Sequence, residues 1–170
     1  HPSFAQIDGA LDAVLAVPEA ARPIVLAALA RRRARRPLIV ATPTGTMAGQ
    51  LADDLAAFLP PGEVELFPAW ETLPFERVSP SVETMGRRLR VLHRLHDPER
   101  TPMIVVSGVR ALLQRLGTWG DAAAPIVVRP GDTLDPDALC TRLTVMGYRR
   151  EELVEHRGER ARHAGLAAVG

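Results

Sequence analysis

The chain has 170 residues, 46% of them hydrophobic and 24% charged, with a formal net charge of +1. This length suits one domain of ordinary size, or one domain with a small appendage, and is enough to bury a core. The near-neutral charge gives no global argument for nucleic-acid binding, and no run of about 18 apolar residues predicts a transmembrane helix.

Two features of the composition indicate where the chain comes from. The single cysteine, Cys140, excludes a disulfide framework and a cysteine-based metal cluster, and fits a reducing compartment. All 21 basic residues are arginine, which G+C-rich coding DNA explains most simply. Because the chain opens on His1-Pro2 and has no signal-peptide pattern, we expect a cytoplasmic piece of a longer protein.

Helical and strand-like patterns alternate along the first half of the chain. This alternation predicts an α/β fold built in layers. The run Leu38–Ala41 is short and continuously apolar, as is typical of a buried parallel strand. The expected elements are helices over 3–17 and 19–35, a strand over 38–41, a helix over 46–58 and a strand over 64–67.

A proline-rich loop leads into an arginine-rich helix, for which Ser79 and Pro80 are suitable as N-cap and first helical residue. Apolar spacing predicts that Val82, Met85, Leu89 and Leu92 point inward. We therefore expect its arginines to point outward, where they contact phosphate or an acidic partner, or form a solvated face. These are Arg87, Arg88, Arg90 and Arg94.

The second half continues the alternation up to a change in composition. A loop rich in Ala and Gly at 119–125 suggests a domain boundary, and the tail from Tyr148 is strongly charged. Asp135 and Gly147 are expected to bracket the last helix. The predicted elements are strands over 103–106 and 126–128 and helices over 109–116 and 136–146.

The turn Thr42–Met47 follows a strand and precedes a helix, which is where a nucleotide-binding loop would lie. A Walker A loop requires a lysine for the phosphates and a Ser or Thr for Mg²⁺, but Met47 and Ala48 stand there and the chain has no lysine. ATP hydrolysis by these residues is not expected, although a helix N-terminus can attract an anion.

Other groups give weaker signals. His93 and His96 have a permissible metal spacing without an evident third ligand, and surface histidines explain them more simply. Asp53 and Asp54 diverge on a helix and cannot form a catalytic pair. Neither a metal site nor a catalytic residue is predicted.

The most specific string is Phe67–Glu76, Phe-Pro-Ala-Trp-Glu-Thr-Leu-Pro-Phe-Glu, followed by Ser-Pro and Arg-Arg-Leu. It resembles the N-terminal region of bacterial transcription-repair coupling factors (Mfd), a region similar to the excision-repair protein UvrB. The resemblance implies a three-layer, helicase-like (RecA-like) α/β subdomain without an ATP site over residues 1–124. It further implies that residues 125–170 begin an α+β inserted subdomain, the UvrA-docking part.

The resemblance also implies a docking site for UvrA. Arg149, in Gly-Tyr-Arg, falls on a position that matches a docking arginine, and Arg162 is the nearest candidate for a second one. The family's apolar strand pattern is lost after Arg157-Gly158-Glu159, so the strands of this part are expected to be unpaired. Only Ala69–Pro80 occupy the place of UvrB's DNA-threading hairpin, so DNA clamping is not expected there.

The implied function is non-catalytic. The chain would recruit UvrA in transcription-coupled nucleotide excision repair and help to regulate an ATP-dependent DNA translocase. The motor of that translocase, with its ATP and Mg²⁺, and its contacts to RNA polymerase and DNA would lie in the rest of the parent protein. The alternatives are an arginine-rich nucleic-acid-binding α/β module and a nucleotide-dependent enzyme.

Overall fold

The computed structural model describes residues 13–32, 36–71, 81–116, 126–146, 148–155, 158–163 and 166–169, with the backbone alone for 162–163 and 166–169. These residues form two compact units. The first contains the described residues up to 71 and Thr84–Arg115, and the second contains Ser81–Glu83 and the described residues beyond Arg115.

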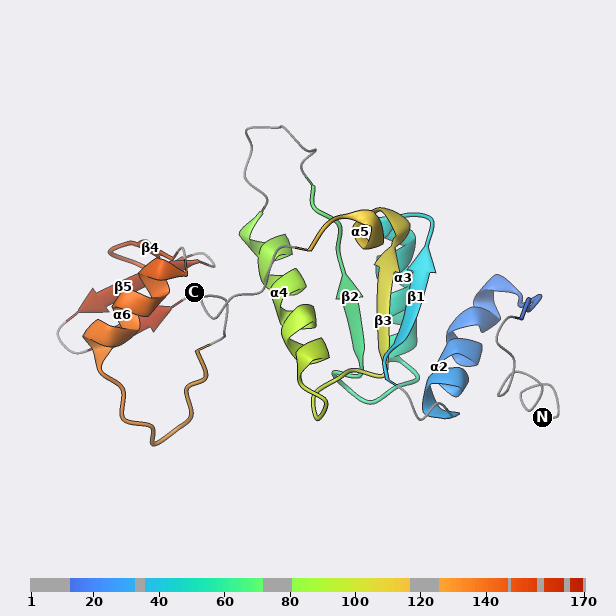
Figure 1. The fold of residues 1–170 in the computed structure, drawn as a ribbon, viewed down its shortest axis with the longest axis horizontal. Coiled ribbons are helices and arrows are strands. Elements are labelled where there is room, and N and C mark those ends of the chain that lie inside the picture. Colours follow the sequence, from blue (N-terminus) through green and yellow to red (C-terminus); the bar gives the residue numbers. More distant parts are fainter. Residues whose placement is uncertain are drawn as a thin grey trace. The chain divides into compact units, whose positions relative to one another are not determined.

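A parallel sheet forms the centre of the first unit (Figure 1). Its strands are β1 (Leu38–Thr42), β2 (Val64–Phe67) and β3 (Ile104–Gly108), in the order β1-β3-β2. Both outer strands align with the central one, with Leu38 and Val64 opposite Ile104. The strands expected over 38–41, 64–67 and 103–106 and the α/β class are therefore confirmed.

Helices cover both faces of this sheet, because side chains of β3 point alternately to the two sides. Ile104 and Val106 belong to a cluster with α2 (Arg22–Arg32) and α3 (Gly45–Ala56), whereas Val105 belongs to a second cluster with α4 (Val82–His96) and α5 (Val109–Leu113). All five residues of β3 are buried. β1 is an edge strand and Ile39 is 56% exposed, so the prediction of a fully buried strand was wrong for it.

The predicted inward face of α4 was wrong for three of its four residues, whereas Leu92 packs against the second core cluster. Val82, Met85 and Leu89 are 40%, 39% and 40% exposed, whereas the buried residues of this helix are Thr84, Arg88 and Val91. Arg88 therefore points into the protein. The helix is rotated relative to the apolar pattern because Arg88 finds a set of partners on the β2 side.

The second unit is built around α6 (Pro136–Val145), whose N-cap Asp135 accepts a hydrogen bond from Asp137 N at 2.9 Å, as the sequence predicts. A separate sheet has the order β4-β5-β6, with β4 (Arg149–Arg150) parallel to β5 (Glu159–His163) and β6 (Leu166–Val169) antiparallel to it. The expectation of unpaired strands was wrong, since backbone hydrogen bonds do not need the lost apolar side chains.

Two further predicted elements are absent from the described residues. Residues 126–128 lie in neither sheet, and a strand cannot persist without a partner for its backbone groups. Residues 13–17 are not helical, and the remainder of that predicted helix lies outside the described residues, as do Ser79, Pro80 and the 119–125 boundary. None of the described helices has the length and hydropathy needed to span a bilayer.

Candidate functional site

Arg88 is buried within the first unit, where it is only 2% exposed. Its Nη1 donates a hydrogen bond to the carbonyl oxygen of Pro68 at 2.6 Å. Its guanidinium lies 4.2 Å from the centroid of the Phe67 ring and 4.5 Å from that of Trp70. Burial lowers the pKa of Arg88 from its usual value, yet an arginine keeps its charge in proteins. This arginine fastens α4 to the end of β2.

Arg90 and Arg94 both converge on one carboxylate oxygen of the buried Glu65. Arg90 donates from Nε at 3.0 Å and from Nη2 at 2.8 Å, and Arg94 donates from Nη1 at 2.7 Å. Arg94 also donates to the carbonyl oxygens of Gly62 and Arg100. These two arginines hold α4 against β2 and the turn before it.

Three of the four candidate arginines of α4, Arg88, Arg90 and Arg94, contact the β2 side in this way, and the exposed Arg87 also has an interaction partner. The face expected to contact phosphate or a partner is therefore largely engaged within the fold. This weakens the nucleic-acid-binding alternative, which would use this face.

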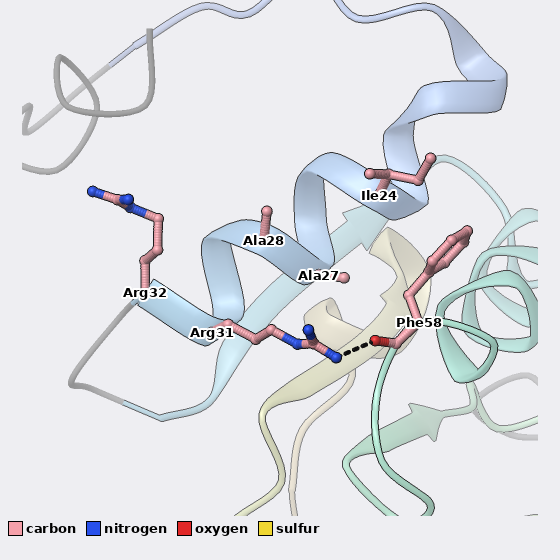
Figure 2. Close-up of a pocket in the computed structure, with 6 residues that line it drawn as sticks. All are labelled: Ile24, Ala27, Ala28, Arg31, Arg32 and Phe58. Atoms are coloured by element: carbon pink, nitrogen blue, oxygen red, sulfur yellow. Dashed lines mark hydrogen bonds between the residues drawn. The ribbon is translucent and has the colours of Figure 1, made fainter. Parts of the chain in front are cut away.

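At the basic C-terminal end of α2, Arg31 also forms a hydrogen bond within the fold. Arg31 Nη2 donates to the carbonyl oxygen of Phe58 at 2.7 Å, across a mainly apolar groove lined by Ile24, Ala27 and Phe58 (Figure 2). In the same view Arg32 points away from Phe58. Arg31 thus ties α2 to the chain that follows α3.

The turn between β1 and α3 lies at the carboxyl ends of the parallel strands, where α/β proteins often bind ligands. Thr44 caps α3, since its hydroxyl accepts a hydrogen bond from Met47 N at 3.2 Å. A cavity of about 570 Å³ adjoins this turn and is lined in part by Thr46, Trp70 and Arg110. Arg110 lies on α5, so the turn itself contributes no cation.

The second unit contains the predicted docking residue Arg149. This residue is exposed on β4, opposite Glu159 of β5, and its backbone N–H donates to the carbonyl of Gly158 at 2.8 Å. The backbone of Arg162 lies in β5, but its side chain is outside the described residues. The structure therefore places Arg149 on a strand that pairs with its neighbour. A joint role of Arg149 and Arg162 in docking stays a prediction.

Sequence reasoning missed two arginines beside this strand. Arg150 and Arg160 are directly opposite in the β4–β5 register and line a cavity of about 260 Å³ with residues of α6. Neither belongs to the motif that drew attention to Arg149. The only sequence signal was the density of charge after Tyr148.

The remaining candidate groups form no further site in the part of the chain that is described. It contains no group of three or more His, Cys, Asp or Glu side chains arranged for a metal ion. The ring of His96 lies within hydrogen-bonding distance of the Leu92 carbonyl of its own helix. Cys140 is a free, partly exposed thiol on α6.

Nearly the whole chain is similar in sequence to part of several named proteins. It is 38% identical over 160 residues to the transcription-repair-coupling factor of Mycobacterium tuberculosis, covering 91% of this chain and 13% of that protein. It is 32% identical over 148 residues to that of Escherichia coli and 29% identical over 151 residues to that of Bacillus subtilis, covering 86% and 88% of this chain. The chain spans only 12–13% of the length of these relatives. No protein-family model matches it.

Proposed function

The chain is homologous to the N-terminal region of transcription-repair-coupling factors, and on that basis we propose that it is a non-catalytic, UvrA-docking segment of such a factor. Residues 1–124 would be the helicase-like subdomain and residues 125–170 the start of the docking subdomain. Recruitment of UvrA would bring the excision-repair machinery to the site where the parent protein acts.

The observation that carries this proposal is the position of Arg149. This arginine is exposed on a strand whose backbone is hydrogen-bonded to its neighbour, so the guanidinium is presented from an ordered scaffold. Exposed arginines on ordered scaffolds suit recognition of carboxylates, because the planar guanidinium donates two parallel hydrogen bonds.

The β1–α3 turn supports a segment without a motor. A phosphate loop would place a lysine and a magnesium-binding hydroxyl at the start of α3, whereas Met47 and Ala48 occupy these positions. The hydroxyl of Thr44 already accepts the Met47 N–H. ATP hydrolysis, DNA translocation and contact with RNA polymerase would then belong to the rest of the parent protein, whose motor this segment would help to keep inactive.

A calorimetric titration of the chain with purified UvrA tests the proposal. We expect saturable binding, which Arg149→Ala weakens by about 1 kcal/mol or more through the loss of a charge-assisted contact. Arg142→Ala is the matched control, because Arg142 is an exposed arginine on α6 of the same unit. A folded chain that does not bind UvrA, or that binds equally well without Arg149, would rule out this docking role.

A further inference from the structure

A polar cavity of the second unit lies between α6 and the strands β4 and β5. Its volume is about 260 Å³. The described residues that line it come from one face of α6 and from one register position of the two strands. They are Asp137, Cys140, Thr141, Thr144, Arg150 and Arg160.

The two arginines at this cavity are neighbours on adjacent strands. Arg150 and Arg160 are paired in the parallel register of β4 and β5, which puts their side chains on the same face. Like charges directly opposite each other are destabilising. Asp137 supplies the one carboxylate among the described lining residues, which therefore carry two positive charges and one negative charge.

The fold holds one of these arginines in place. Arg160 Nη2 donates to the hydroxyl oxygen of Thr144 at 2.8 Å. Its Nε is buried and has no hydrogen-bond partner among the described residues. Arg150 is exposed beside it. The pair therefore combines one anchored guanidinium with one that is free to adjust to a ligand.

The two threonine hydroxyls at the cavity are already engaged as donors. The hydroxyl of Thr141 donates to the Asp137 carbonyl at 2.9 Å, and that of Thr144 donates to the Cys140 carbonyl at 2.8 Å. The guanidinium N–H groups are then the principal donors left to a ligand. Such a site suits an acceptor with a negative charge.

We infer that Arg150 and Arg160 form a pocket that receives a carboxylate side chain of the docking partner. This inference rests on the proposed function, and it adds a second point of attachment to Arg149. A protein carboxylate is favoured over a nucleic-acid phosphate because a cavity of about 260 Å³ suits a single compact anion better than a continuous line of phosphates.

Acetate tests the pocket by itself, without UvrA. Sodium acetate is titrated against sodium chloride at constant ionic strength, and the arginine Nε–Hε resonances of the labelled chain are followed by NMR. We expect saturable shifts for Arg150 and Arg160 that disappear in Arg150→Gln and persist in Arg142→Gln. Shifts that are absent, or that chloride reproduces, would overturn the pocket.

UvrA titrations of the same variants test its role in docking. We expect Arg150→Gln and Arg160→Gln to raise the Kd roughly tenfold, as for loss of a hydrogen bond to a charged group, and Arg142→Gln to leave it unchanged. Circular dichroism monitors folding of Arg160→Gln, and the exposed Arg150 provides the test if that variant does not fold.

The outcomes separate the two proposals. If Arg149→Ala weakens UvrA binding and Arg150→Gln does not, the pocket inference fails and the proposed function stands. If the wild-type chain does not bind UvrA, the proposed function fails and the acetate titration alone decides the pocket. Binding of single-stranded or duplex DNA that Arg150→Gln abolishes would overturn the assignment of a protein carboxylate.

Discussion

The arginines of α4 and those of the strands β4 and β5 have different surroundings. Arg88, Arg90 and Arg94 bond to the Pro68 carbonyl or to Glu65. Arg149 and Arg150 are exposed and form no ion pair with any described residue. Arginines with internal acceptors hold the first unit together, whereas Arg149 and Arg150 of the second unit are exposed to solvent.

The difference follows from what lies opposite each group. The end of β2 offers the flat rings of Phe67 and Trp70, a free carbonyl and a buried carboxylate, all within reach of α4. A planar guanidinium satisfies all three kinds of partner. Strand β4 has only two residues and lies at the edge of its sheet, and although Glu159 is opposite Arg149 in the register, no ion pair between described residues joins them.

Replacement of Arg88 tests the first half of this comparison most severely. We expect Arg88→Ala to lower the free energy of unfolding by about 3 kcal/mol, because it leaves the Pro68 carbonyl unpaired and removes a buried cation from two aromatic rings. Urea unfolding measures the loss. The control Arg115→Ala, at an exposed position, should change stability by less than about 0.5 kcal/mol. Equal effects of the two would show that Arg88 is not a structural arginine.

Glu65 should have the next largest effect. We expect Glu65→Ala to destabilise the chain by about 2 kcal/mol, since it removes the shared acceptor of Arg90 and Arg94. The larger loss of stability expected when a fully buried ion pair is broken does not apply, because the Arg90 side chain is 66% exposed.

A double-mutant cycle of Glu65→Ala with Arg94→Ala assigns this loss. The 2.7 Å contact between the two side chains predicts a coupling energy of about 1 kcal/mol. Additive effects would mean that the buried carboxylate acts through something other than this arginine.

The N-cap of α6 gives a smaller effect, in the second unit. Asp135→Ala should cost about 1 kcal/mol, because the Asp137 N–H loses its acceptor, whereas Asp135→Asn should keep most of the stability. Hydrogen exchange of the α6 amides reports this change locally. Faster exchange in both variants would point to charge, not to the capping hydrogen bond.

The smallest expected effect sharpens the second half of the comparison. Arg149→Ala should change the free energy of unfolding by less than about 0.5 kcal/mol, because its side chain is exposed and has no ion pair with a described residue. Urea unfolding beside Arg88→Ala measures the contrast directly. A large loss of stability would give Arg149 a structural role and remove the main support for docking.

Local patterns predicted most of the first unit correctly. The runs around Val40 and Leu66 are mainly apolar and bounded by Pro or Gly, and they form β1 and β2. The cap at Asp135 was equally clear, since capping depends on residues only two apart. Patterns failed where distant segments decide. Residues 126–128 lack a partner strand, and β5 and β6 pair despite an uninformative sequence.

By itself, the sequence determined the alternation of helix and strand, the absence of a phosphate-binding lysine and the resemblance that identifies the relatives. Only the tertiary structure decided that Arg88 is buried and that Glu65 forms ion pairs with both Arg90 and Arg94. It also decided that Arg150 lies opposite Arg160 in the β4–β5 register. The reason is physical. Helical periodicity records which side chains share a face, but whether a charged face is buried depends on acceptors contributed by other elements, such as Pro68, which lies 20 residues before Arg88.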